Sequence, residues 1–316
     1  MNSKNIERRN NLTGSIMLTV CAIIWGSSFV AQTTGAEYVG PFTFISLRSL
    51  LGSAFLVPVI IFMNTLNKKK TPFENNAPSE SKKGKGFFLL GGTVCGICLC
   101  VASVLQQMGI DKGTSPGKAG FITALYILLV PIFSIFLKKK IRPLIWICVA
   151  LSIAGLYLLC VTDNSVQSSD FYVLACAVCY AVHILVIDYV SPHVDGVKLS
   201  CMQFFVCGVI AAVPMLLSEE ISFELLKGAA LSIAYSGIMS SGVAYTLQIL
   251  GQQKMNQPTV ASMLMSLESV FAVLTGMLVL SQIPTLKETA GCVLMFGAII
   301  LAQLPEKKKT VYTSLQ

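Results

Sequence analysis

The feature of this chain that most limits its fold is a series of long apolar runs, which recur from near one end to the other. Several reach about 18 residues or more, the length that an α-helix needs to cross a hydrocarbon layer roughly 30 Å thick. Backbone groups find no water in such a layer, so the runs are expected to be helices. Charged residues make up only 12% of the 316 residues, about half the share of an ordinary soluble domain. A soluble globule is therefore excluded.

We expect an all-α membrane protein with ten transmembrane helices, separated by short polar gaps. The predicted spans cover residues 12–31, 42–63, 86–108, 119–137, 143–161, 170–190, 198–217, 228–251, 258–280 and 284–304. The gaps between them are too short to fold as separate domains.

The distribution of Lys and Arg predicts the orientation of these spans. With the N-terminus inside the cell, eighteen basic residues fall in cytoplasmic segments and four fall outside. Basic residues in short loops favour the cytoplasmic side, so both termini are expected inside. The net charge of +8 is then explained by the topology. The sequence has no basic patch interleaved with aromatic residues, so it gives no indication of nucleic-acid binding.

An internal repeat divides the spans into two sets of five. A shift of 155 residues aligns Cys21-Ala22 with Cys176-Ala177, and a shift of 142 aligns Gln106 with Gln248. The shift becomes smaller after the second span, because the first half carries the long basic linker 64–85 there. Because five crossings is an odd number, the second set must enter the membrane from the opposite side. This predicts two inverted five-helix repeats, with a solute site between them near the midplane.

The expected domain layout follows from these boundaries. A cytoplasmic tail covers residues 1–11, the first repeat 12–161, an external loop 162–169, the second repeat 170–304 and a basic cytoplasmic tail 305–316.

Several stretches of both repeats resemble the drug/metabolite transporter superfamily, specifically its EamA-type members. The resemblance lies in residues 25–30 (WGSSFV), 41–48, 114–131, 257–261 (QPTVA) and 267–272 (LESVFA). It implies a ten-helix transporter that moves small metabolites, commonly amino acids or related compounds, through a central cavity. The chain departs from the family pattern at Ser281-Gln282, where members often have Gly-Glu, and at Ser269, where they often have proline.

Polar side chains within spans are expected to face the bundle interior or a wet cavity, because hydrocarbon surrounds the rest. Nine residues from both halves are our candidates for the solute pathway: Trp25, Ser28, Gln106, Tyr126, Tyr180, His183, Tyr245, Gln248 and Glu268. The repeat pairs Tyr126 with Glu268 and Ser28 with His183, so these groups should converge on one volume. An aromatic and amide lining suits an organic solute with a flat or apolar body and a polar head.

Each candidate also has an ordinary structural interpretation. Ser28 can bond its own backbone, Gln106 and Gln248 can hold helices together, and the tyrosines can be packing residues. His183 can be a satisfied bundle residue instead of a proton carrier. Glu268 lies in mid-span with no partner adjacent in sequence, and it is the strongest functional candidate. For Glu268 the structural alternatives are a permanent salt bridge and a hydrogen bond to a helix terminus.

Arg48, in the second span, is interpreted differently. Its predicted depth lies closer to the outer end of the span, where a long side chain can extend to the interface. We therefore expect a structural role for Arg48.

The function predicted from these features is secondary active transport, by alternating access, of a small organic metabolite across the cytoplasmic membrane. The solute is an amino acid, a related compound or a drug-like molecule; export is the expected direction, and coupling to protons through Glu268 is left open. No phosphate-binding loop of the ATPase type is present, and no cofactor or metal is expected.

Two other classes of function stay open. An intramembrane enzyme would need a catalytic motif such as HExxH, which does not occur in the sequence, or a Ser nucleophile at a Gly-x-Ser-x-Gly strand-to-helix turn. The one match to that second pattern, residues 113–117 (GTSPG), lies in a gap between two predicted helical spans. A channel or uncoupled facilitator would be expected to place rings of like residues around a pore. The expected partners are the solute, the lipid bilayer and, under the coupling hypothesis, a proton. The oligomeric state is undetermined.

Overall fold

A computed structural model describes residues 3–68, 84–114, 116–160, 167–255, 257–280 and 285–304. Helices and turns make up these residues, so the fold is all-α within them. The first half contains α1 (Ser3–Ala36), α2 (Pro41–Lys68), α3 (Gly84–Asp111), α4 (Pro116–Ala124), α5 (Tyr126–Phe136) and α6 (Pro143–Cys160). The second half contains α7 (Ser168–Val190), the short η1 (Ser191–His193), α8 (Gly196–Ser218), α9 (Phe223–Tyr235), η2 (Ser236–Ala244), α10 (Tyr245–Met255), α11 (Pro258–Met265), α12 (Glu268–Leu280) and α13 (Leu286–Ala302).

These elements form ten helical stretches at the predicted positions, when segments that directly follow one another are joined. Six helices in the described part of the chain are long and apolar enough to cross a membrane, and shorter apolar helices cover 143–158, 258–272 and 289–302. The tail 305–316, Ser281-Gln282 and most of the linker 64–85 and of the loop 162–169 lie outside the described residues.

Two acidic side chains cap helices at the polar ends of the bundle. Asp195 Oδ1 accepts hydrogen bonds from the backbone N–H groups of Val197 and Lys198, at 3.0 and 2.9 Å, at the start of α8. Glu219 caps a helix of the other half, because its carboxylate accepts from the N–H groups of Phe42 and Thr43 at 2.9 and 2.7 Å. A negative charge at a helix N-terminus is favourable, so Glu219 ties α2 to the end of α8.

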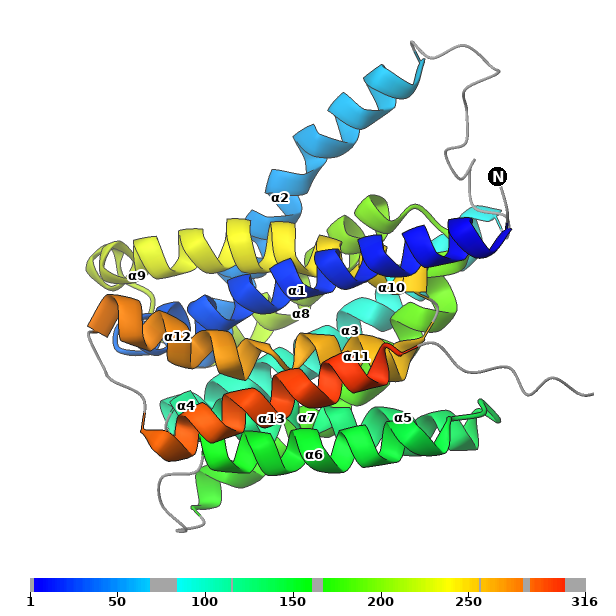
Figure 1. Cartoon of the computed structure of the whole chain (residues 1–316). Helices are drawn as coiled ribbons and strands as arrows, with labels where there is room; N and C mark the ends of the chain where they lie inside the picture. Colours follow the sequence, from blue (N-terminus) through cyan, green and yellow to red (C-terminus); the bar gives the residue numbers. More distant parts are fainter. Residues whose placement is uncertain are drawn as a thin grey trace, which may run out of the picture.

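The two halves are interlocked, because the main helix contacts join one half to the other. Helix α2 packs against α8, α6 packs against α13, α3 packs against α7 and α8, and α1 packs against α10 and α12. Figure 1 shows these helices in one bundle, from which the light-blue end of α2 projects. The helices of each half are therefore packed mainly against helices of the other half.

Two of the stretches are broken at corresponding places. The first break separates α4 from α5 at Leu125, and the second separates α11 from α12 at Ser266 and Leu267. Short i→i+3 hydrogen bonds tighten the chain there, from Leu128 N–H to Leu125 O and from Ser269 N–H to Ser266 O, at 3.0 and 3.3 Å. The breaks place Tyr126 and Glu268 at the first positions of α5 and α12.

A π-helical segment, η2, interrupts the stretch 223–255 and lies against α2. The approach is close at Gly52, where an added Cβ would lie 2.7 Å from Ser241 Cβ and 2.8 Å from Gly237 O. A side chain at Gly52 would push α2 away from η2. Such π-bulges are frequent at functional sites.

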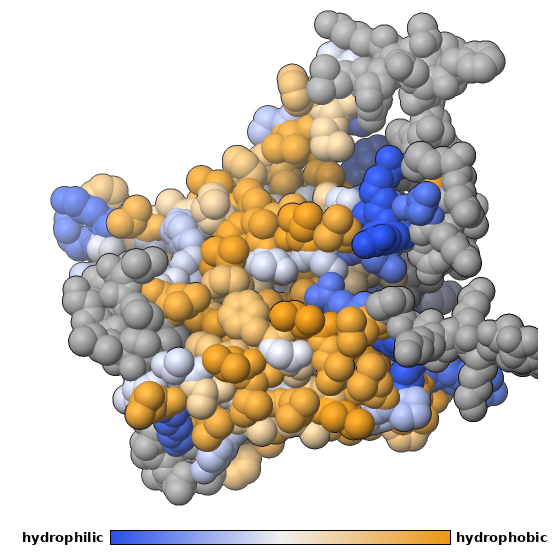
Figure 2. All heavy atoms as spheres, in the orientation of Figure 1, coloured by the Kyte–Doolittle hydropathy of each residue, from blue (hydrophilic) through white to orange (hydrophobic). Residues whose placement is uncertain are grey.

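The surface of the bundle is apolar around its middle. Large hydrophobic side chains point outward, including Leu231, which is 82% exposed, and Ile300, which is 64% exposed. Figure 2 shows a hydrophobic band with hydrophilic residues gathered toward the two ends of the visible face. This pattern is that of a surface surrounded by lipid.

Candidate functional site

A cavity lies inside the bundle, where both halves meet. Its wall is formed by Trp25, Ser28, Phe29, Gln32, Arg48, Gln106, Thr123, Tyr126, Tyr180, Ile184, Ser240, Tyr245, Gln248, Met265 and Glu268. Eight of the nine predicted pathway residues are among them. The mixture of aromatic and polar groups in this wall is typical of sites for small organic ligands.

Aromatic side chains form one part of the wall. The rings of Trp25 and Tyr245 lie 4.6 Å apart between centroids, and Phe204 supports Tyr245 edge-on at 5.1 Å. The Tyr245 hydroxyl donates to the Tyr180 hydroxyl at 3.3 Å, which also contacts Ser103 Oγ at 3.1 Å. These bonds hold the rings in place and leave aromatic surface for a flat or apolar solute body.

The Tyr126 hydroxyl donates a hydrogen bond to Glu268 Oε1 at 3.2 Å. Both side chains are buried, at 3% and 5% exposure. They come from helices of different halves, and the repeat shift of 142 residues separates them. Within the described residues, Glu268 forms no ion pair, so the salt-bridge alternative for this carboxylate has no support there.

The amide and hydroxyl candidates differ in their hydrogen bonds. Gln106 Nε2 donates to Thr123 Oγ1 at 3.0 Å, so this amide links α3 to α4. Ser28 Oγ donates to the backbone oxygen of Trp25 at 3.0 Å, as its structural interpretation predicted, while still lining the cavity. Gln248 is 1% exposed, and its Oε1 atom has no partner. An unpaired buried acceptor at a cavity wall is available to a ligand donor.

Arg48 lies in the cavity wall, which corrects its predicted place near the outer interface. The side chain is only 3% exposed, so it does not extend to the surface. Its guanidinium carbon lies 5.8 Å from the centre of the Phe44 ring, and its Nε atom has no hydrogen-bond partner. The sequence prediction was wrong because it used depth along the helix, whereas the packing of α2 against α8 and η2 turns Arg48 inward.

His183 is the one pathway candidate that does not line the cavity. It is fully buried behind the wall, where its ring lies 6.2 Å from that of Tyr245. Its Nε2 atom pairs with Gln203 Oε1 at 3.0 Å. The structural interpretation of His183 therefore fits its position better than a role in contact with solute.

Six further wall residues were missed by the sequence analysis, in addition to Arg48. Helical spacing could have found most of them, because residues three or four apart share a helix face. The missed residues that lie three or four positions from a predicted one are Phe29, Gln32, Thr123, Ile184 and Met265. Ser240 lies within the π-helical η2, where α-helical spacing does not apply.

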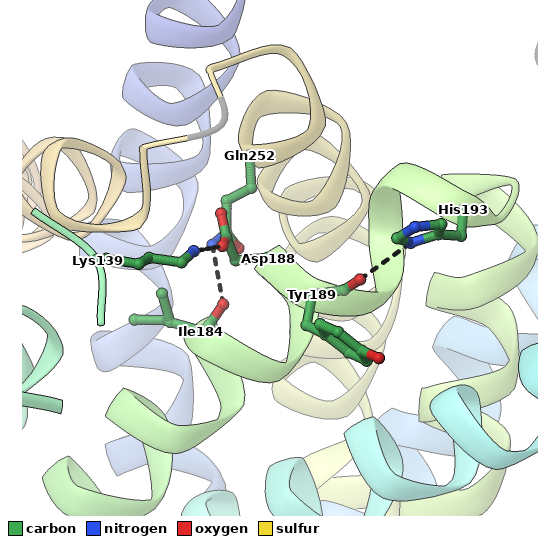
Figure 3. A network of polar contacts seen from close by, with 6 residues as sticks. All are labelled: Lys139, Ile184, Asp188, Tyr189, His193 and Gln252. Atoms are coloured by element: carbon green, nitrogen blue, oxygen red, sulfur yellow. Dashed lines mark hydrogen bonds and ion pairs between the residues drawn. The ribbon is translucent and has the colours of Figure 1, made fainter. Parts of the chain in front are cut away.

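A polar network lies near one end of the bundle, beyond the cavity residue Ile184 (Figure 3). The Lys139 ammonium pairs with the Asp188 carboxylate, which joins the turn after α5 to α7. Gln252 Nε2 donates to the backbone oxygen of Ile184 at 3.2 Å, which joins α10 to α7. The ion pair therefore ties the two halves together at this end, and the Gln252 bond holds two helices of the second half together.

Comparison with known proteins gives matches along nearly the whole chain. The sequence matches the EamA-like transporter family at residues 12–161 and 167–304. An uncharacterized transporter of Archaeoglobus fulgidus is 26% identical over 304 residues, which cover 94% of this chain and 88% of that protein. The uncharacterized transporter YwfM of Bacillus subtilis is 22% identical over 305 residues, 94% of this chain and 96% of the other. A solved crystal structure of a protein 17% identical to this chain shares its fold, with a TM-score of 0.74 over 92% of this chain and 96% of that one.

Proposed function

This chain belongs to the EamA-like transporter family, and from that premise we propose that it is a secondary active transporter of a small organic metabolite. As a member, it is a multi-pass membrane transporter. The proposal adds alternating access, a place in the cytoplasmic membrane, export as the direction and coupling to protons. Amino acids and related compounds are the proposed solutes.

The observation that carries this proposal is a buried cavity whose polar wall is shared by the two halves. Both halves contribute side chains to one volume, so a relative movement of the halves would change which end of the cavity is open. Transporters built from repeats place their solute sites in this way.

The contacts between the halves support an inverted repeat. Under a pseudo-two-fold axis, α2 corresponds to α8 and α6 to α13, and each of these pairs is in contact. Tyr126 and Glu268 also correspond, and they are hydrogen-bonded to each other. Two equivalent residues can touch only close to the axis, so this bond supports an axis that runs through the cavity.

Glu268 is the proposed proton carrier, because it is the only acidic side chain in the cavity wall of the described structure. When the cavity faces one side of the membrane, its carboxylate can take up a proton from that side. After the halves move, it can release the proton to the other side. Tyr126 donates a hydrogen bond to this carboxylate, and such a bond favours the ionised form between these steps.

Glu268→Gln tests the coupling, because glutamine keeps the shape and hydrogen bonding but cannot titrate. In proteoliposomes the variant is expected to exchange solute across the membrane at near-parental rates. It should fail to concentrate solute when a pH gradient is imposed. The exposed Glu220→Gln is the matched control and should behave like the parent.

The opposite result would locate the proton elsewhere. If Glu268→Gln concentrates solute as the parent does, this carboxylate is not the coupling site. If flux through the parent rises linearly with concentration and never saturates, the protein is a channel or facilitator, and the secondary-transport proposal fails.

A further inference from the structure

We propose that Arg48 binds a carboxylate group of the transported solute, so that the cavity selects organic carboxylates over organic cations. This inference rests on the proposed transport function and assigns a specificity-determining residue to the same cavity. It follows from two properties of Arg48: its positive charge has no counter-ion, and its Nε–H group has no hydrogen-bond acceptor.

The positive charge of Arg48 is buried without a counter-ion. The side chain is 3% exposed, and no carboxylate of the described residues lies within ion-pair distance of it. Its Nε–H has no acceptor, and the contact that it makes is with the face of the Phe44 ring, at 5.8 Å. A buried charge without a partner is costly, so an anion bound next to Arg48 would be stabilised.

Glu268 does not neutralise Arg48. It lines the same cavity, yet its carboxylate accepts a hydrogen bond from Tyr126 and forms no ion pair with Arg48. A structural arginine inside a bundle would be expected to donate to backbone oxygens or hydroxyl groups, as the half-buried Arg142 does to Ala302 O and Leu304 O. Arg48 makes no hydrogen bond of that kind within the described part of the chain.

The chemistry of the wall favours a carboxylate as the missing anion. A guanidinium group offers parallel N–H donors that match the two oxygens of a carboxylate. A second donor in the wall, Trp25 Nε1, is also without a partner, whereas Gln248 Oε1 is an unpaired acceptor. The tilted rings of Trp25 and Tyr245 offer surface to the body of the solute. The site therefore fits a small carboxylate with a flat or apolar body and, at its other end, a hydrogen-bond donor.

Binding can be measured separately from transport, because the chain has two tryptophans and Trp25 lies in the cavity wall. On a Trp146→Phe background, quenching of Trp25 fluorescence reports ligand binding to the purified protein. The probes are a panel of small carboxylates with aromatic or branched aliphatic bodies, each tested beside its neutral amide and its amine.

The parent is expected to bind carboxylates more tightly than the matched amides and amines. Arg48→Met should weaken carboxylate binding roughly 10- to 100-fold, the range expected for loss of a charged hydrogen-bonded pair. Binding of the amides should change less than about threefold. Arg9→Met, which removes the same charge from an exposed position, should leave every affinity unchanged. Arg48→Lys, which keeps the charge without the planar fork, should give an intermediate affinity.

Several outcomes would overturn the assignment. The parent could bind amines as well as carboxylates, or it could bind none of the panel. Arg48→Met could also weaken all three classes equally. The first two outcomes require only the parent, so they hold even if an Arg48 variant fails to fold. If the parent prefers carboxylates but never accumulates them in proteoliposomes, the transport proposal fails while the Arg48 assignment stands.

Discussion

The residues around the cavity show how a repeat can build an asymmetric site. Gln106 and Gln248 are equivalent under the shift of 142 residues, and both line the cavity. Their bonding differs, because Gln106 donates to Thr123 while the Gln248 oxygen has no partner. Equivalent positions therefore supply one group used for packing and one group free for a ligand.

This difference predicts different consequences for the two Gln→Leu variants. Gln248→Leu should weaken solute binding several-fold without loss of stability, because the Gln248 side-chain oxygen has no hydrogen-bond partner to lose. Gln106→Leu removes a bond between helices, worth about 0.6 kcal/mol on average in a membrane protein, and should weaken binding as well. Thermal unfolding in detergent and ligand titration measure the two effects. Equal destabilisation by both variants, with unchanged affinity, would assign both amides to packing.

At the scale of elements, the approach of α2 to η2 depends on the absence of a side chain at Gly52. Gly52→Ala should lower stability by about 1–3 kcal/mol, because the new methyl group would meet Ser241 and Gly237 within 2.8 Å. Gly297→Ala is the control, since a Cβ at that exposed helical position meets nothing within 4 Å. Apparent melting temperatures in detergent compare the two. A Gly52→Ala protein as stable as the control would show that α2 and η2 can separate freely.

The ion pair near the end of the cavity makes a second prediction at this scale. By the predicted topology, Lys139 and Asp188 lie at the cytoplasmic end, where their contact would hold the two halves together. Asp188→Asn should increase the opening of that end by at most about fivefold, because Lys139 is 40% exposed and such pairs contribute little. The measurement is the labelling rate of Ser240→Cys in inside-out vesicles, on a cysteine-free background.

The exchanged pair, Lys139→Asp with Asp188→Lys, provides the control. It should restore the parental labelling rate, because it restores the attraction between the turn after α5 and α7. If the exchange labels as fast as Asp188→Asn, the contact does not hold the cytoplasmic end closed.

For the whole molecule, the testable statement is its orientation in the membrane. Ser79→Cys and Gln167→Cys, introduced singly into a cysteine-free protein, should be labelled from opposite sides. The Gln167 variant should react with an impermeant reagent in intact cells, and the Ser79 variant only after permeabilisation. Ser79 lies outside the described residues, so this test depends on the count of spans alone. Labelling of both from one side would contradict the inverted repeat.

The positions of the helices could be predicted from the sequence because hydropathy is a local property. A run such as 86–108 must be helical and span the bilayer whatever its neighbours are, and α3 is found there. The internal repeat pairs Tyr126 with Glu268. From the sequence alone, this pairing predicted that most of the cavity residues lie together.

Four features could not be predicted in this way. They are the inward turn of Arg48, the position of His183 behind Tyr245, the π-helical η2 and the helix break before Glu268. Each depends on which face of a helix meets a neighbour, and in these spans apolar residues cover the faces toward lipid and toward protein alike. Hydropathy therefore does not distinguish the two faces. Contacts between residues distant in sequence make that choice, such as those that bring Gly52 against Gly237, and they exist only once the two halves have packed together.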